Sequence, residues 1–249
     1  MALTSLDSPS ARNYQRAPLP APSTPWREAE FCVVDVELTG LNPVVHEIIS
    51  FAVVRVVAGR VRLADTLYRT VRPRRMPEAD SIRIHGLREI DLEHAPTFSE
   101  VLDELLEALT GRVMVAHVAA IDESFLRAGL RAHGVTLRNP VLDTAALAVE
   151  LRRRRRLPSS WQTPRLPSRY AESSPGLSDL ARTLGLPAHR PHQADGDALT
   201  AAQVFLALAT HFETLEQPLT LAALQQLNER GLAPQGRSLP RRVAALFGR

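Results

Sequence analysis

The chain has 249 residues, of which 45% are hydrophobic, so it is long enough to bury one sizeable core. Its single cysteine, Cys32, excludes an internal disulfide, and no apolar run reaches the length needed to cross a membrane. All basic residues are arginines, and the formal net charge of +3 permits a nucleic-acid partner without establishing one.

The first half of the chain predicts a disordered tail followed by three strands. Residues 1–25 are rich in proline, serine and alanine and show no periodicity, which is typical of a disordered segment. The apolar segments 31–37, 47–59 and 60–73 predict strands, the last two joined by a turn at Ala58–Gly59. Three consecutive strands with tight connections favour an antiparallel meander.

Helices and short strands alternate in the second half. A capping box formed by Thr97 and Glu100 opens a helix over residues 97–109. The remaining predicted elements are strands at 112–117 and 140–143 and helices at 120–134, 144–151, 177–185, 197–215 and 220–231. This order predicts an α/β fold in which helices cover the faces of a mixed sheet.

The first strand carries two carboxylates, Asp35 and Glu37, in an otherwise apolar run. Alternate side chains of a strand point to the same face, so the two acids project together. Unpaired, they would repel one another and raise the pKa of one of them, a penalty that a divalent cation removes. The alternative is a pair at the strand end that forms salt bridges with arginine.

Two further acids stand at predicted helix starts. Asp122 lies in the first turn of the helix that follows the strand ending at His117. Asp197 begins the long helix, with His192 five residues before it on a loop. Each acid also has a plain structural interpretation, because a carboxylate at a helix start complements the helix dipole.

Taken together, these motifs resemble the DEDDh (DnaQ-like) 3′–5′ exonucleases, the family of the proofreading epsilon subunit of bacterial DNA polymerase III. The first family motif is Asp-x-Glu followed by Thr-Gly, the second places an Asp after an Ala-His strand end, and the third reads His-x-Ala-x-x-Asp-Ala. A looser feature is Ile-His-Gly before the first long helix. The matching residues are Asp35, Glu37, Thr39 and Gly40; Asp122; His192, Ala194, Asp197 and Ala198; and Ile84, His85 and Gly86.

The resemblance implies an RNase H-like fold. Such a fold has a mixed five-stranded sheet, built from a three-strand antiparallel meander plus parallel strands, with helices on both faces. We therefore expect an exonuclease domain over residues 26–215, followed by a C-terminal helix and basic tail over 216–249.

The same resemblance implies a two-metal hydrolysis of nucleic-acid 3′ ends to nucleoside 5′-monophosphates, with DNA favoured. Hard oxygen ligands favour two Mg²⁺ or Mn²⁺ ions per active site. By resemblance, Asp35 bridges both ions. Glu37 and Asp197 hold the ion that activates water, and Asp122 helps to hold the second.

The resemblance also assigns a general base and a substrate-binding set. His192 is expected to take the proton from the attacking water, and the ordinary pKa of histidine, about 6.5, suits that task. Thr39 and Gly40 are expected to let the backbone approach the terminal nucleotide. His85 is expected near the terminal phosphate or sugar, although a buried structural histidine is the alternative.

The chain departs from the family pattern at two positions. Val118 stands where the family usually has asparagine, and Ile121 where it usually has an aromatic residue. Neither residue is a metal ligand, so we expect altered substrate preference or rate. Two other functions stay open: an RNA-trimming 3′–5′ exoribonuclease, and a catalytically inactive nucleic-acid-binding module.

The expected partner is a single-stranded or frayed 3′ end of DNA, or of RNA, and a DNA polymerase or sliding clamp is a further candidate. No membrane partner is expected, and an N-terminus without the pattern of a secretory signal predicts a cytoplasmic protein. The run Arg152–Arg156 is interpreted either as a phosphate contact or as a solvated helix end. The segment QGRSLP, residues 235–240, resembles a clamp-binding peptide but lacks its terminal aromatic residue.

Overall fold

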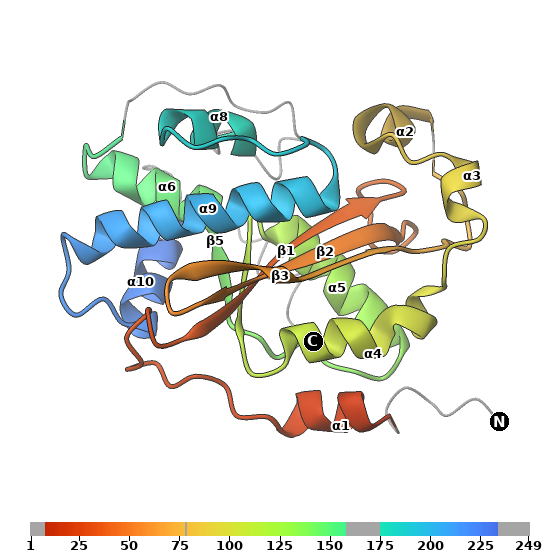
Figure 1. The fold of residues 1–249 in the computed structure, drawn as a ribbon, viewed down its shortest axis with the longest axis horizontal. Helices are drawn as coiled ribbons and strands as arrows, with labels where there is room; N and C mark the ends of the chain where they lie inside the picture. Colours follow the sequence, from red (N-terminus) through yellow and green to blue (C-terminus); the bar gives the residue numbers. More distant parts are fainter. Residues whose placement is uncertain (1–7, 78, 158–174, 234–249) are drawn as a thin grey trace.

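The centre of the molecule is a mixed five-stranded sheet (Figure 1). The structure is a computed structural model that describes residues 8–77, 79–157 and 175–233. Its strands lie in the order β3-β2-β1-β4-β5. Their bounds are β1 Glu30–Leu38, β2 Ile48–Val57, β3 Arg60–Thr70, β4 Val113–Ala116 and β5 Val141–Asp143.

The strand pairing confirms the predicted meander. β1 pairs antiparallel with β2, and β2 antiparallel with β3. The turn between β2 and β3 is made by Ala58 and Gly59, both with positive φ angles, of 50° and 68°. β4 and β5 continue the sheet in parallel with β1. β1 is therefore the central strand, and its carboxyl end lies beside the carboxyl ends of β4 and β5.

Helices cover both faces of the sheet, as predicted (Figure 1). One face packs mainly against the long helix α9, Ala194–Glu213, and the other against α4, Phe98–Leu109, and α5, Ala120–Ala132. The layer that contains α9 also holds α6 Thr144–Arg153, α8 Leu177–Thr183 and α10 Leu221–Leu232. The predicted capping box is present at the start of α4, where Glu100 Oε2 accepts the backbone N–H of Thr97 at 2.7 Å. Elements from both layers thus reach the carboxyl end of β1.

The N-terminal segment corrects one prediction. Disorder is predicted for residues 1–25, but α1 forms over Pro9–Arg16 and packs against α4. Its buried Tyr14 donates a hydrogen bond to Asn139 Oδ1 at 2.6 Å and accepts one from the Arg138 N–H at 3.0 Å. Residues 1–7 lie outside the described part. The prediction is wrong for the rest of the segment because contacts 125 residues away in sequence, rather than local periodicity, hold it.

Two short helices are not predicted by the sequence. α2 spans Ala79–His85 and α3 spans Glu89–Leu92. Both lie between the meander and α4, and α3 has only four residues. Helices this short fill only part of the window of about 11–18 residues over which an apolar period is recognised.

The C-terminal segment contains the predicted helix, α10, which packs against α6 and β5. The expected basic tail lies in residues 234–249, outside the described residues, so the domain boundaries at 26 and 215 stay predictions. Among the described residues, no helix is both long and apolar enough to cross a membrane.

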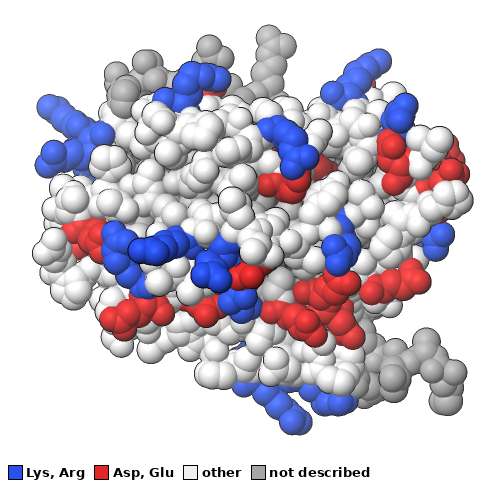
Figure 2. Space-filling view, viewed as in Figure 1, with Lys and Arg blue, Asp and Glu red and all other residues white. Residues whose placement is uncertain are grey.

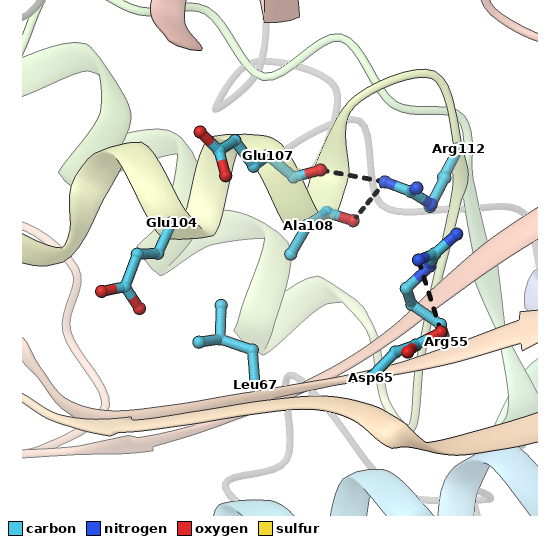
Figure 3. A pocket seen from close by; sticks show the side chains of 7 residues that line it. All are labelled: Arg55, Asp65, Leu67, Glu104, Glu107, Ala108 and Arg112. Carbon is cyan, nitrogen blue, oxygen red and sulfur yellow. Dashed lines mark hydrogen bonds and ion pairs between the residues drawn. The ribbon is translucent and has the colours of Figure 1, made fainter.

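Both signs of charge are present on one face. Figure 2 shows arginines and acids mixed on the left of the lower half of the view and acids gathered toward its right. On the α4 side of the sheet, a shallow pocket of about 360 Å³ lies between β3 and α4 (Figure 3). Its arginines are already bonded: Arg55 to Asp65 at 3.5 Å, and Arg112 to the Glu107 carbonyl at 2.9 Å. This pocket lies at the amino end of β1, away from the acids of that strand.

Candidate functional site

Three of the predicted acids meet at the carboxyl end of β1. Asp35 and Glu37 project from the same face of the strand, and Asp197 comes from the first turn of α9. One carboxylate oxygen from each residue lies within 4.8 Å of the other two. This is the spacing of side chains that share a cation, although the strand and the helix are far apart in sequence.

The fourth acid reaches the same place from the other helical layer. Asp122 is 5% exposed and lies in the first turn of α5. Its Oδ1 accepts the backbone N–H of Val36 at 3.1 Å, so the carboxylate is fixed to β1 between Asp35 and Glu37. The four acids therefore surround the end of one strand, although Asp122 is not part of the group within 4.8 Å.

The electrostatics of the four acids are unfavourable without a cation. Burial, followed by the charges of the neighbouring acids, raises the pKa of Asp35 well above its ordinary value. Burial and the charge of Asp197 raise the pKa of Glu37 to about 8. Burial also raises the pKa values of Asp122 and Asp197. No described arginine forms an ion pair with any of the four, which argues against the salt-bridge alternative for this strand.

His192 lies on the loop that leads into α9. Its backbone N–H donates to Asp197 Oδ2 at 2.7 Å, and its φ angle is 62°. The residue is exposed at the site. His189, three residues earlier, is turned onto α9 instead, where its Nε2 lies 3.1 Å from Gln203 Oε1. The two histidines of this loop therefore have different surroundings.

The predicted substrate-binding residues have structural partners of their own. Thr39 is buried, and its hydroxyl accepts the N–H of Glu47 at 3.0 Å. A Cβ added at Gly40 would lie 2.6 Å from Cε1 of His46, so only glycine allows this ring to lie against the chain. These contacts shape the loop that follows β1 directly at the acidic site.

His85 ends α2 and is buried at 7% exposure. Its Nδ1 accepts the N–H of Leu87 at 3.0 Å, and its Nε2 is buried without a hydrogen-bond partner among the described residues. Burial lowers the pKa of this imidazole, which favours the neutral ring. No contact in the described structure links it to the four acids.

Sequence reasoning missed two residues near the site. Tyr68 on β3 is opposite Ala52, which is itself opposite Asp35, so the phenol shares a face of the sheet with that acid. Burial, followed by the charge of Asp195, raises the pKa of this phenol. Asp143, a fifth buried acid, ends β5. Its sequence signal is an acid at a strand end directly before a helix, close to the pattern that singles out Asp122.

The comparison with protein families gives a clear result. A family model described as an exonuclease, RNase_T, matches residues 32–205. The chain is 34% identical over 180 residues to a PolC-type DNA polymerase III of Thermotoga maritima, covering 72% of this chain and 12% of that protein. It is 34% identical over 189 residues to a DNA polymerase III subunit epsilon-like protein of Rhodobacter capsulatus, covering 74% and 24%. The chain thus spans about a quarter or less of these relatives.

Solved structures agree on the fold. Escherichia coli exonuclease I in complex with a dT13 oligonucleotide matches with a TM-score of 0.63 at 15% identity, covering 75% of this chain and 42% of that one. Exonuclease X in complex with 5′ overhanging duplex DNA matches with a TM-score of 0.56 at 20% identity, covering 80% and 99%. The predicted RNase H-like fold is confirmed, and the chain belongs to the RNase T family of exonucleases, with a DnaQ-like domain.

Proposed function

We propose that this chain hydrolyses nucleic acid from the 3′ end and releases nucleoside 5′-monophosphates, with DNA as its favoured substrate and two divalent cations as its cofactor. The observation that carries the proposal is the convergence of four carboxylates that have no described cationic partner. Within an exonuclease family, such a cluster is best explained as a site for the cations that phosphodiester hydrolysis needs.

The residues present fit divalent cations in both charge and chemistry. Carboxylate oxygens are the ligands that Mg²⁺ and Mn²⁺ prefer, and four of them balance two dications. The raised pKa values of Asp35 and Glu37 also support the fit, because the charged forms of these groups lack compensation in the protein itself. Two such ions, when bound, would neutralise the charge that develops on the phosphodiester.

The chain's own side chains divide the remaining work. With the ions bound, Asp35 would help to hold both of them, Glu37 and Asp197 would hold the one that activates water, and Asp122 would help to hold the other. The backbone N–H of His192 donates to Asp197 Oδ2 and so fixes the loop beside that pair. The imidazole of His192 forms no hydrogen bond to the described residues. We assign His192 as the base that accepts a proton from the attacking water.

The terminal nucleotide is proposed to bind at the loop after β1. Thr39 and Gly40 leave the strand at the acids, and the hydrogen bonds of Thr39 to Glu47 hold this loop in place. His85 presents a buried Nε2 without a described partner and is kept as a candidate substrate contact.

The proposed setting is DNA replication in the cytoplasm. The relatives named as DNA polymerase III PolC-type and epsilon-like proteins favour a DNA polymerase as partner, and a sliding clamp is kept as a further candidate. An exoribonuclease has the same site chemistry, because hydrolysis does not require the 2′-hydroxyl.

The test is product analysis on 5′-labelled single-stranded oligonucleotides in Mn²⁺. Labelled fragments should shorten stepwise from the 3′ end, mononucleotides should carry a 5′-phosphate, and a 3′-terminal phosphorothioate should slow the reaction. Immediate release of the 5′ label as a mononucleotide would show the opposite polarity. Matched DNA and RNA oligonucleotides compare the two substrate classes, and absence of any Mn²⁺-dependent product would favour the inactive binding module.

Asp35→Ala is the essential control for this test. Removing the acid that would hold both ions should nearly abolish hydrolysis while the circular dichroism of the folded protein stays unchanged. Activity in Mg²⁺ at about a tenth of wild type or more would contradict the metal assignment.

A further inference from the structure

Behind the four acids lies a fifth, Asp143, which the proposed chemistry does not use. It ends β5, caps the start of α6 and is 7% exposed. Its Oδ1 accepts the backbone N–H groups of Val118 at 2.9 Å and Ala145 at 2.8 Å. No described arginine or histidine pairs with it. A buried carboxylate needs hydrogen-bond donors to compensate its burial, and here backbone N–H groups before α5 and at the start of α6 supply them, so the function of this acid lies in what it holds.

The contact with Val118 indicates what that function is. Val118 has a φ of 57°, in the left-handed region, which costs about 1–2 kcal/mol for a residue other than glycine. Such a conformation persists only where the surroundings enforce it. The bond from Val118 N–H to Asp143 supplies this constraint, directly between the end of β4 and the start of α5. Asp122 follows four residues later, in the first turn of the helix that this bond positions.

Neighbouring bonds hold the same junction. His117 Nδ1 lies 2.8 Å from Thr144 Oγ1, and its Nε2 lies 2.9 Å from the Pro175 carbonyl. A carbonyl only accepts, so Nε2 carries the proton and Nδ1 accepts from the threonine hydroxyl. Burial lowers the pKa of His117 to about 4, which keeps the ring neutral in this arrangement.

The C-terminal helix supports Asp143 from the opposite side. Asn228 on α10 is buried, and its Oδ1 accepts the backbone N–H of Asp143 at 2.8 Å. Further along α10, Gly231 lies so close to the Ala146 carbonyl that any side chain there would collide with it. α10 lies outside the residues matched by the exonuclease model, 32–205. A chain of bonds therefore runs from α10 through β5 to the start of α5.

We propose that Asp143 is a positioning residue, held by Asn228, that fixes the start of α5 and thereby sets the Asp122 carboxylate for cation binding. The inference rests on the proposed function. It gives α10 a role in the site that a mere packing helix would not have. Burial and, to a lesser extent, the charges of Asp143 and Glu37 raise the pKa of Asp122.

The experiment compares four variants of the full chain: Asp143→Ala, Asp143→Asn, Asn228→Ala and the control Thr220→Ala. Thr220 caps the same helix α10 through its hydroxyl, which accepts the Ala223 N–H at 3.2 Å, but no described bond links it to β5. Two properties are measured: amide hydrogen exchange over residues 116–123 in EDTA, and Mn²⁺ affinity by titration calorimetry. The first readout needs neither metal nor substrate.

Asp143→Ala should accelerate exchange at Val118 and the following amides and weaken Mn²⁺ binding about 10–100-fold, the range for removing a group that orients a ligand. Asn228→Ala should act in the same direction by a smaller factor. Thr220→Ala should leave Mn²⁺ affinity within about twofold, although it removes a helix cap. Asp143→Asn keeps one acceptor oxygen and should fall between wild type and Asp143→Ala. If Asp143→Ala does not fold, the amide exchange and Mn²⁺ affinity of Asn228→Ala and Asp143→Asn test the proposal in its place.

Two results would overturn the inference: folded variants at Asp143 and Asn228 with wild-type exchange, or faster exchange with unchanged Mn²⁺ affinity. The second result would mean that Asp143 stabilises the fold but does not position Asp122 for cation binding. A wild-type protein that binds no Mn²⁺ overturns the proposed function instead, so the two failures are distinguishable.

Discussion

At the scale of single residues, the histidine loop before α9 separates two chemically identical side chains by their surroundings. His192 is exposed beside the acids, and its backbone N–H donates a hydrogen bond to Asp197. The ring of His189 instead forms a hydrogen bond with Gln203. A general base must reach its proton from within hydrogen-bond distance, so only the first of these histidines has the required freedom. Position on the loop, rather than residue type, decides the assignment.

We predict that His192→Ala lowers the turnover number by about two to four orders of magnitude, the range for removal of a general base. Mn²⁺ affinity should change little, because all four acids remain. Single-turnover kinetics together with calorimetry measure the two quantities. His189→Ala is the matched control and should stay within a few-fold of wild type. A His192→Ala protein that no longer binds Mn²⁺ would show instead that this histidine is a ligand.

A second residue, Tyr14, tests the unpredicted N-terminal contact. Tyr14→Phe removes a buried hydroxyl and leaves Asn139 Oδ1 and the Arg138 N–H without that partner. Leaving such groups unpaired costs about 1–3 kcal/mol, so the free energy of unfolding in urea should fall by that amount. Tyr68→Phe, on the partly exposed edge strand, should change it by less than about 0.5 kcal/mol. Equal effects would mean that α1 contributes no specific contact.

At the scale of elements, the arginine run at the end of α6 divides into two parts. Arg153 donates to the Ala233 carbonyl at 2.6 Å, and Arg154 bonds Glu150 at 3.0 Å and Glu216 at 2.8 Å. These side chains tie α6 to the ends of α9 and α10. Arg155 and Arg156 are exposed, and neither forms an ion pair with an acid in the described part of the chain. The first part of the run therefore holds helices together, and the second is available to a phosphate.

The double variant Arg155→Ser/Arg156→Ser should weaken single-stranded DNA binding and reduce the salt slope of the affinity, by about 0.7 for each phosphate that is no longer neutralised. Its melting temperature should not change. Arg154→Ser should do the reverse, with stability lowered by about 1 kcal/mol and an unchanged slope. Fluorescence anisotropy at several salt concentrations measures the slope. If the double variant leaves the salt slope of the affinity unchanged, these two arginines do not contact phosphate and belong to a solvated helix end.

The sequence predicts those elements and site residues that leave a local signal, which is either a periodic spacing of side chains or an acid at the start of a helix. The two-residue spacing of Asp35 and Glu37 places both acids on one face, and Asp122 and Asp197 are correctly placed in first turns. The helix α1 and the role of Asp143 depend instead on distant partners, 125 residues away for Tyr14 and 25 for Asp143. Local patterns carry no signal of such partners, because tertiary contacts override weak local preference.

At the scale of the whole molecule, the acidic site should make folding stability depend on pH and metal together. The pKa of Glu37 is raised from 4.5 to about 8, so between these values the folded protein holds more protons than the unfolded chain. Stability therefore falls as pH rises through this window. Below about 6.5 the neutral, buried His117 acts oppositely, since its folded pKa is about 4 and the unfolded chain binds that proton first.

The window in which Glu37 acts without opposition from His117 therefore runs from about pH 6.5 to about 8. In EDTA, the free energy of unfolding should fall across it by more than about 1 kcal/mol, since each pKa unit corresponds to about 1.4 kcal/mol. Urea unfolding at each pH measures this. Glu37→Gln, which cannot titrate, should reduce the slope, and Asp35 and Asp122, whose pKa values are also raised, keep part of it. Added Mn²⁺ should restore the stability of wild type at the upper end of the window, by about 2.7 kcal/mol at a hundred times its Kd. A wild-type profile that is flat in EDTA and indifferent to Mn²⁺ would mean that the four carboxylates neither repel one another nor share a cation.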